Sequence, residues 1–202
     1  MGTEDRIREA ALVSFGTKGY DATSLDQVAG DLGIRKQTIL YYFPSKVALL
    51  EAVIDQSSAE LATVLERTIE QSGEGFDRIE AIVRAVFRVA VRRPELLGLL
   101  REVSRLGAPA ASHLLENFEP LVERATAFLE AEMDAGRFRR SDARLVLVSV
   151  YSTIVGTATE VEVLRAVGIE PTLRTTVERR RQVIGFLHAA LVPDSRPNGS
   201  RP

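Results

Sequence analysis

The side chains most able to bind a ligand or a polymer lie together between Gly33 and Lys46 of this 202-residue chain. The segment contains three cations and no aspartate or glutamate. Arginine and lysine can donate hydrogen bonds to guanine O6 and N7, glutamine can pair with adenine, and a threonine methyl can contact a thymine methyl. Tyrosine hydroxyls and lysine ammonium groups suit phosphate oxygens. We therefore interpret the segment as a short helix that lies against DNA; the alternative is a basic surface helix that faces only solvent.

Signals before this segment predict two helices. Thr3 can cap the first helix, and Gly19 is well placed to end it. Thr23 and Asp26 form a Thr-x-x-Asp pattern, which favours the start of a helix. This second helix is short and continues to Leu32.

The segment itself predicts a turn, a helix and a stop. Gly33 makes the turn, a third helix covers about residues 35–42, and Pro44 ends it because proline cannot continue a helix. Ser45 then caps a long fourth helix that reaches about Gln71. Two short helices joined by a glycine-containing turn form a helix-turn-helix unit.

The position of each polar side chain in this unit predicts its contact with DNA. In a helix-turn-helix the second helix enters the major groove and its N-terminal residues meet base edges. Residues 35–38 lie at that end, whereas the two tyrosines and Lys46 lie near the other end, where phosphates are in reach. Backbone N–H groups at Ser24 and Ser45, where two helices begin, can add phosphate contacts. The predicted DNA-binding residues are Thr23, Ser24, Arg35, Lys36, Gln37, Thr38, Tyr41, Tyr42, Ser45 and Lys46.

The composition limits the other functions that the chain can have. The formal net charge is −2, so any basic face is local and the chain is not a general polyanion binder. Cysteine is absent, which excludes disulfides and thiolate metal sites and fits the reducing cytoplasm. We also expect no secretory signal and no membrane span, since no apolar run approaches the roughly 20 residues that a bilayer requires.

Sequence patterns typical of enzymes are missing. The chain has no Glu-x-x-His pair for a di-metal bundle, no Gly-x-Ser-x-Gly elbow and no phosphate-binding Gly-x-x-x-x-Gly-Lys loop. We therefore expect no enzymatic activity, no cofactor and no metal site. The remaining alternative to a DNA-binding regulator is an all-helical adaptor that binds another protein.

The rest of the chain predicts further helices after a break at residues 72–75. Pro120 must kink or divide one of them, because its ring clashes with the carbonyl of Glu116. The composition of residues 193–202 predicts a disordered tail. The predicted helices cover about residues 76–92, 94–106, 110–135, 142–166 and 171–191.

Residues 145–151 are apolar and rich in β-branched side chains, which also favours a strand. No partner strand is evident, so we predict a helix, and a helix that is apolar all round must be covered all round. The last helix carries two apolar stripes. We therefore predict that the last two helices pair with their copies in a homodimer, and the alternative is a single-chain core. The stripes are Leu173, Val177, Ile184, Leu187 and Leu191 on one face, and Val183, Phe186 and Ala190 on another.

The sequence contains no motif that predicts a ligand site. Four aromatic residues fall on the later helices and are weak candidates for lining a pocket, although aromatic residues at helical spacing more often belong to the core. Glu160 and Glu162 point to different helix faces, so they do not suggest a cation site. The weak candidates are Phe87, Phe118, Phe128 and Tyr151.

Residues 7–50 closely resemble the DNA-binding domain of the TetR family of bacterial one-component regulators. The resemblance is long and specific, although it covers only about a quarter of the chain. It rests on Ile7, Ala10, Ala11, Phe15, Gly19, Tyr20, Thr23, Ser24, Val28, Ala29, Gly33, Ile34, Thr38, Tyr41, Phe43, Pro44, Ser45, Lys46, Leu49 and Leu50.

Two departures from the family pattern concern DNA contacts. Arg35 stands where the family often has a serine, so the third helix loses its usual cap and gains a cation. Leu40 stands where the family commonly has a tyrosine, and Tyr42 where it has a histidine. Leu40 cannot donate a hydroxyl to phosphate, whereas Tyr42 can replace the histidine as a donor.

The resemblance implies a homodimer that binds a palindromic operator, usually represses transcription, and is released when a small-molecule effector binds. It also implies an all-α fold, with an N-terminal three-helix DNA-binding domain and a larger C-terminal helical domain for ligand binding and dimerisation. We place these domains at residues 1–46 and 47–192, followed by the tail at residues 193–202.

Overall fold

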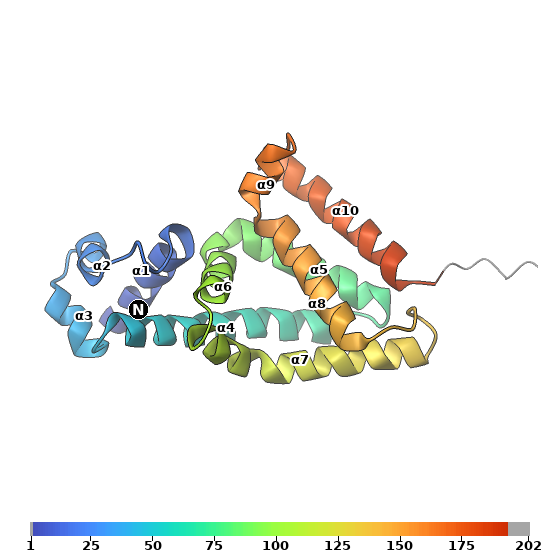
Figure 1. Cartoon of the computed structure of the whole chain (residues 1–202), viewed down its shortest axis with the longest axis horizontal. Helices are drawn as coiled ribbons and strands as arrows, with labels where there is room; N and C mark the ends of the chain where they lie inside the picture. Colours follow the sequence, from blue (N-terminus) through green and yellow to red (C-terminus); the bar gives the residue numbers. More distant parts are fainter. Residues whose placement is uncertain (1, 194–202) are drawn as a thin grey trace, which may run out of the picture. The chain divides into compact units, whose positions relative to one another are not determined.

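The computed structural model describes residues 2–193, and this part of the chain contains ten α-helices and no strand (Figure 1). The all-α prediction is therefore confirmed. The predicted tail lies outside the described residues from position 194 onward. No helix within residues 2–193 combines the length and the apolar character needed to cross a membrane. The helices are α1 (Thr3–Lys18), α2 (Leu25–Leu32), α3 (Lys36–Tyr42), α4 (Lys46–Gln71), α5 (Phe76–Arg92), α6 (Pro94–Leu106), α7 (Ala110–Asp134), α8 (Ala143–Thr159), α9 (Val161–Ala166) and α10 (Leu173–Leu191).

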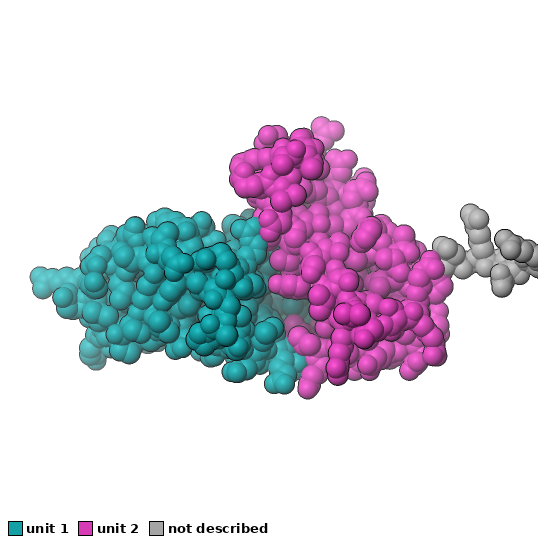
Figure 2. All heavy atoms as spheres, in the orientation of Figure 1, with its two compact units in different colours: residues 1–66, 88–120 teal, residues 67–87, 121–202 magenta. Residues whose placement is uncertain are grey.

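The chain forms two compact units, which Figure 2 distinguishes by colour. The N-terminal unit comprises residues 1–66 and 88–120, and the C-terminal unit comprises residues 67–87 and 121–202. Helices α4, α5 and α7 each contribute residues to both units. The N-terminal unit thus contains more than the three helices before residue 46, and the functional boundary placed there stays a prediction.

The N-terminal unit is organised by the contact of α1 with α6. Gly16 in α1 and Gly98 in α6 bring the two backbones together: a Cβ added at Gly98 would lie 2.2 Å from the carbonyl oxygen of Gly16. Helices α2 and α3 also contact α1. The helices of this unit bury apolar side chains, among them Ile7, Leu12 and Phe15 of α1.

An arginine just before α6 links three helices of the same unit. The guanidinium of Arg93 lies 3.0 Å from a carboxylate oxygen of Glu9 in α1 and 3.3 Å from one of Glu60 in α4, and it also pairs with Glu95 in α6. The group is partly exposed, so solvent screens these pairs and their contribution to stability is modest. Its arrangement nevertheless favours one packing of α1, α4 and α6.

The C-terminal unit has its own core, built from α5, α7, α8 and α10. Helix α8 packs against α10, and residues 145–151 are helical as predicted. The two predicted stripes of the last helix are wrong in detail, since Val183 joins Leu187 and Leu191 in the core while Leu173 and Val177 are exposed. The core residues are Ile79, Val83, Phe87, Leu129, Met133, Phe138, Ala143, Val150, Ile154, Val183, Leu187 and Leu191.

The predicted helix at residues 142–166 is divided, which is why the structure has one more helix than the sequence predicted. Glu160, with φ −79° and ψ 69°, ends α8 and precedes α9. The buried guanidinium of Arg179 in α10 donates a 2.5 Å hydrogen bond to the carbonyl of Thr157. This side chain satisfies a carbonyl at the end of α8, so the helix can stop without a glycine or proline.

Two smaller predictions about helices α1 and α10 also need correction, and of the kink or division predicted at Pro120 the structure excludes the division. Gly2, and not Thr3, is the N-cap of α1, and its N–H donates to the carboxylate of Asp5. Helix α7 continues through Pro120 without a division, at a place where Glu116 and Pro120 are exposed and water can reach the freed carbonyl. The last helix begins after its cap Thr172, two residues later than predicted.

The close contact of α1 with α6 predicts a strong effect of one methyl group. The alanine Cβ in Gly98→Ala would meet the backbone of α1 rather than a movable side chain. The variant should therefore lower the free energy of unfolding by about 1–3 kcal/mol. Urea denaturation followed by circular dichroism measures the change. Gly30→Ala is the matched control, since it also adds a methyl group inside a helix but meets no atom within 4 Å. It should be neutral or stabilise by up to about 1 kcal/mol, and equal losses in both variants would contradict the packing argument.

Candidate nucleic-acid interface

The turn between α2 and α3 has the geometry of a helix-turn-helix. Gly33 adopts a left-handed conformation with φ +66°, which glycine accepts without steric cost. The N–H of Gly33 donates to the carbonyl of Gly30 and that of Ile34 to the carbonyl of Ala29, a pattern that closes the end of a helix. The turn thus fixes the direction in which α3 leaves α2.

The start of α2 is capped by Ser24 and not by Thr23, so the predicted Thr23–Asp26 box is wrong. The N–H of Gln27 donates to Ser24 Oγ at 3.1 Å, and the N–H of Ser24 donates to Gln27 Oε1 at 2.6 Å. Thr23 is buried, and its hydroxyl donates to the carbonyl of Gly19 at 2.8 Å. The side chain of Thr23 therefore supports the preceding turn and does not face solvent.

The N-terminal end of α3 presents the predicted base-reading side chains. Arg35 is the N-cap residue, is exposed, and makes no side-chain capping hydrogen bond, as the departure from the family pattern predicted. Gln37 is exposed and Thr38 is half-buried. Ile39 is fully buried and anchors α3 on the core. The helix thus has one face held in the unit and one free to meet a groove.

Lys36 is partly engaged within the free protein. Its Nζ lies 2.8 Å from Oδ2 of Asp26 in α2, and the two side chains are 42% and 68% exposed. An ion pair this open contributes at most about 1 kcal/mol. The ammonium group can therefore exchange Asp26 for a stronger partner at little cost.

The other end of α3 carries the tyrosines and leads directly into α4 (Figure 1). Tyr41 is 83% exposed, and its ring lies edge-on to that of Tyr42 with centroids 5.1 Å apart. Ser45 caps α4 by accepting the N–H of Ala48 at 3.0 Å. Two tyrosines thus directly precede the start of a long helix, whose backbone N–H groups suit a phosphate.

Lys46 differs from the other predicted contacts because it is turned into the protein. Its Nζ donates to the carbonyl of Tyr20 at 2.5 Å and lies 4.0 Å from the centroid of the Tyr20 ring. The side chain is half-buried. Its predicted role as a phosphate contact stays a prediction. In the free protein the ammonium group contacts Tyr20 instead.

Comparison with known proteins identifies this arrangement. Residues 7–53 match the family "Bacterial regulatory proteins, tetR family". The chain is also 26% identical over 151 residues to the HTH-type transcriptional regulator RutR of Escherichia coli, an alignment that covers 73% of this chain and 69% of RutR. Residues 7–53 therefore form a DNA-binding domain of the TetR family. The comparisons thus support a DNA-binding transcriptional regulator, because the relatives are transcriptional regulators and not enzymes.

A second relative matches a shorter stretch of the chain at higher identity. The negative transcriptional regulator IcaR of the biofilm operon in Staphylococcus aureus is 40% identical over 48 residues, which are 24% of this chain and 26% of IcaR.

Solved structures share the fold of this chain over nearly its whole length. The ketosteroid transcriptional regulator KstR2 of Mycobacterium tuberculosis has a TM-score of 0.77 with 16% identity, covering 96% of both chains. A putative regulator from Saccharomonospora viridis in complex with choline has a TM-score of 0.78 with 18% identity, over 94% of this chain and 97% of that one. FadR from Bacillus subtilis in complex with stearoyl-CoA has a TM-score of 0.74 with 17% identity, over 91% and 96%.

The four aromatic candidates for the ligand site are divided between the two compact units. Phe87 is buried in the core of the C-terminal unit, and Phe128 packs against that core with its ring edge-on to Phe138. Phe118 belongs to the N-terminal unit. Tyr151 is half-exposed on α8. The alternative reading, that such aromatics are core residues, holds for Phe87.

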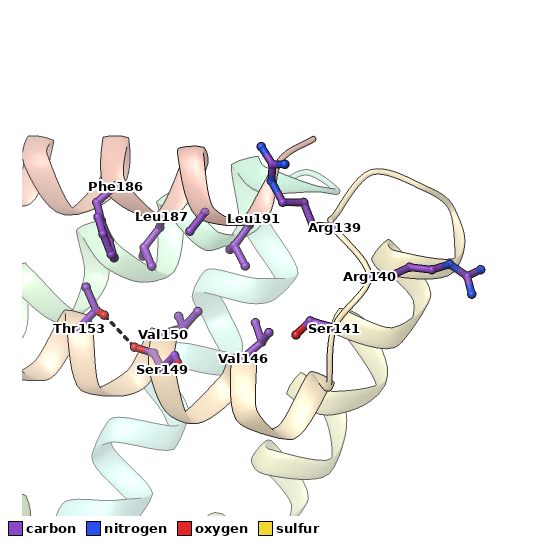
Figure 3. Close-up of a pocket in the computed structure, with 11 residues that line it drawn as sticks. Arg139, Arg140, Ser141, Val146, Ser149, Val150, Thr153, Phe186, Leu187 and Leu191 are labelled. Carbon is purple, nitrogen blue, oxygen red and sulfur yellow. Dashed lines mark hydrogen bonds between the residues drawn. The ribbon is translucent and has the colours of Figure 1, made fainter. Parts of the chain in front are cut away.

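A hollow of about 410 Å³ lies between α8 and α10 in the C-terminal unit (Figure 3). Val146 and Val150 of α8 face Leu187 and Leu191 of α10 across it, while Arg140 points away. None of the four aromatic candidates lines this hollow. Within the described residues no group of three or more His, Cys, Asp or Glu side chains is placed to hold a metal ion.

Two contacts of the interface were missed in the sequence. Gln27 completes the cap of α2, and the Ser-x-x-Gln pattern that it forms with Ser24 was available as a signal. Asp26 pairs with Lys36 ten positions later, and only the turn geometry brings the two together. The first could have been found from spacing, whereas the second could not.

The cap assignment gives a direct test. Ser24→Ala removes the hydroxyl that accepts the N–H of Gln27, so it should lower the free energy of unfolding by about 1 kcal/mol. Thermal or urea unfolding measures the loss. Thr3→Ala is the control, because the N-cap of α1 is Gly2, and this variant should stay within about 0.5 kcal/mol of the wild type. A larger loss of stability from Thr3→Ala than from Ser24→Ala would contradict the caps assigned to α1 and α2.

Proposed function

We propose that this regulator is a repressor that binds a palindromic operator as a homodimer and is released by a small-molecule effector. The observation that carries the proposal is the exposed polar face of α3, held by a capped α2, a glycine turn and a capped α4. The matched family covers the same residues. Since it acts on DNA, we also propose a cytoplasmic location.

We assign the DNA contacts by their place on this frame. Arg35, Lys36, Gln37 and Thr38 at the start of α3 would meet base edges in the major groove. The tyrosines at its end, with the backbone N–H groups where α2 and α4 begin at Ser24 and Ser45, would bind phosphates and set the register. Thr23 is buried, so its contribution is to hold the turn before α2.

The homodimer is supported by apolar side chains that the described chain leaves uncovered. On α8, Leu145 is 66% and Val148 is 61% exposed, and on α10 Phe186 is 62% exposed. Apolar surface of this kind is covered in most proteins, and a two-fold partner covers it with the same surface. A dimer reads two half-sites about 34 Å apart or a multiple of it, so both recognition helices must be correctly spaced.

An effector is supported by what similar structures hold. The Saccharomonospora viridis protein was solved with choline and the Bacillus subtilis FadR with stearoyl-CoA. Their different chemistry gives no single effector for this chain. We propose that helix α4 transmits the effect of the ligand to the reading head, by which we mean the helix-turn-helix of α2 and α3. Helix α4 begins directly after α3, at Lys46, and continues into residues that belong to the C-terminal unit.

Selection of bound genomic fragments tests the DNA-binding proposal and supplies the operator. Affinity for the selected fragment should fall steeply with salt, with a slope of about −0.9 per phosphate neutralised. Lys36→Ala or Gln37→Ala should then relax discrimination by about 1–3 kcal/mol at one base pair in each half-site. Gln71→Ala, which removes the same amide at the far end of α4, should leave the preference unchanged.

Two results would contradict the assignment of these contacts. Unchanged base preference in the Lys36 and Gln37 variants would place the groove contacts elsewhere. Salt-independent binding of the wild type would favour the protein-binding adaptor.

The dimer interface can be tested with a charge on α8. Val148→Glu places a carboxylate on the proposed contact surface, where burial without a partner is costly, so the variant should be monomeric at micromolar concentration and lose operator binding. Analytical ultracentrifugation measures the change. Val122→Glu is the matched control, because Val122 is also exposed but lies on α7. A Val148→Glu variant that remains dimeric would rule out this surface.

A further inference from the structure

Tyr20, in the loop between α1 and α2, is held from two sides by charged side chains. Its carbonyl accepts a 2.5 Å hydrogen bond from Lys46 Nζ at the start of α4. Its N–H donates a 2.5 Å hydrogen bond to Glu102 Oε1 in α6. Its ring packs against the buried Phe15, with centroids 5.4 Å apart. One loop residue thus connects three helices of the N-terminal unit.

We propose that Lys46 and Glu102 are positioning residues for DNA recognition, which fix the loop before α2 and do not themselves contact the operator. For Lys46 this means that its charge serves an internal contact and does not neutralise a phosphate. The inference rests on the proposed function, since it concerns how the reading head is held when it meets DNA.

The surroundings of Lys46 use its ammonium group within the protein. An ammonium group has three N–H donors and no acceptor. One donor meets the Tyr20 carbonyl, and the ring of the same residue lies 4.0 Å away, a distance at which an aromatic face attracts a cation. The side chain is half-buried, whereas Arg35 and Gln37 are exposed. Lys46 therefore connects the start of α4 to the loop between α1 and α2.

Glu102 has the environment of a fixed acceptor. Its side chain is 10% exposed and lies 2.8 Å from Arg105, whose guanidinium also lies 3.0 Å from Asp21 in the loop. The Arg105 guanidinium holds the pKa of the Glu102 carboxyl below its usual range, and the Tyr20 N–H acts in the same direction. The carboxylate thus stays charged at neutral pH and binds the loop on the side of α6.

The loop backbone also approaches this carboxylate closely at Gly19. Gly19 has φ +91°, and a Cβ added there would lie 3.2 Å from Glu102 Oε1. Residues 19–21 therefore lie directly against Glu102 and Arg105. Because α2 begins a few residues later at Leu25, movement of this loop moves the reading head.

Salt dependence separates a positioning role from a phosphate contact. Lys46→Met keeps an unbranched side chain of similar length but removes the charge. If Lys46 only positions the loop, affinity for the selected operator should fall about tenfold while the slope of log K against log salt stays unchanged. If both subunits instead used Lys46 on phosphates, the slope would become shallower by about 1.8, twice 0.9. Lys36→Met is the comparison for loss of a cation assigned to a base edge, and it should relax base preference and leave the slope nearly unchanged.

Glu102 provides a second test in which simple electrostatics predicts the opposite result. Removing a carboxylate from a DNA-binding unit should leave affinity unchanged or raise it, whereas loss of a positioning residue should lower it. We expect Glu102→Ala to weaken operator binding about tenfold and Glu102→Gln, which keeps an acceptor, to recover part of the loss. Circular dichroism and unfolding curves verify that the variants are folded, and Glu102→Gln supplies the measurement if Glu102→Ala does not fold.

The outcomes distinguish this inference from the proposed function. A shallower slope for Lys46→Met, or tighter binding by Glu102→Ala, would overturn the positioning roles while leaving operator binding intact. Absence of salt-dependent operator binding by the wild type would overturn the proposed function and this inference with it.

Discussion

The contact between the backbones of α1 and α6 is the constraint on which the N-terminal unit depends. Gly16 and Gly98 allow an approach in which either added methyl group would collide with the opposite backbone. Helices α2 and α3 contact α1 in turn. The position of the reading head therefore depends on how α1 packs against α6. The two glycines make this packing possible, and the charged groups around Arg93 and Tyr20 favour one arrangement of it.

Helix α3 illustrates why the frame matters more than the helix itself. It has seven residues, and a helix this short is not stable alone in water. It has no side-chain cap at Arg35 and depends on Ile39 in the core, Gly33 before it and Ser45 after it. Its exposed residues contribute little to folding and remain available for binding, which separates the residues that specify shape from those that meet a ligand.

Local signals in the sequence predicted most helices and the helix-turn-helix, because caps, glycine turns and apolar periodicity act over a few residues. They failed where distant residues decide. The break at Glu160 depends on Arg179 reaching the end of α8, and the inward turn of Lys46 depends on Tyr20. Composition placed Lys46 correctly on the basic segment but could not show which way its side chain points. The cap of α2 at Ser24 lay within reach of spacing rules, since two overlapping patterns competed there.

The ion pair of Lys36 with Asp26 changes how the affinity of this side chain for DNA is counted. Lys36 does not enter a complex from water alone, because in the free protein its ammonium already has a carboxylate 2.8 Å away. Its contribution to binding is therefore the difference between the Asp26 carboxylate and the acceptor that DNA offers. A DNA site that offers Lys36 only a weak or misplaced acceptor gains almost nothing from it, so Asp26 acts as an internal competitor that sharpens selectivity while lowering general attraction to polyanions.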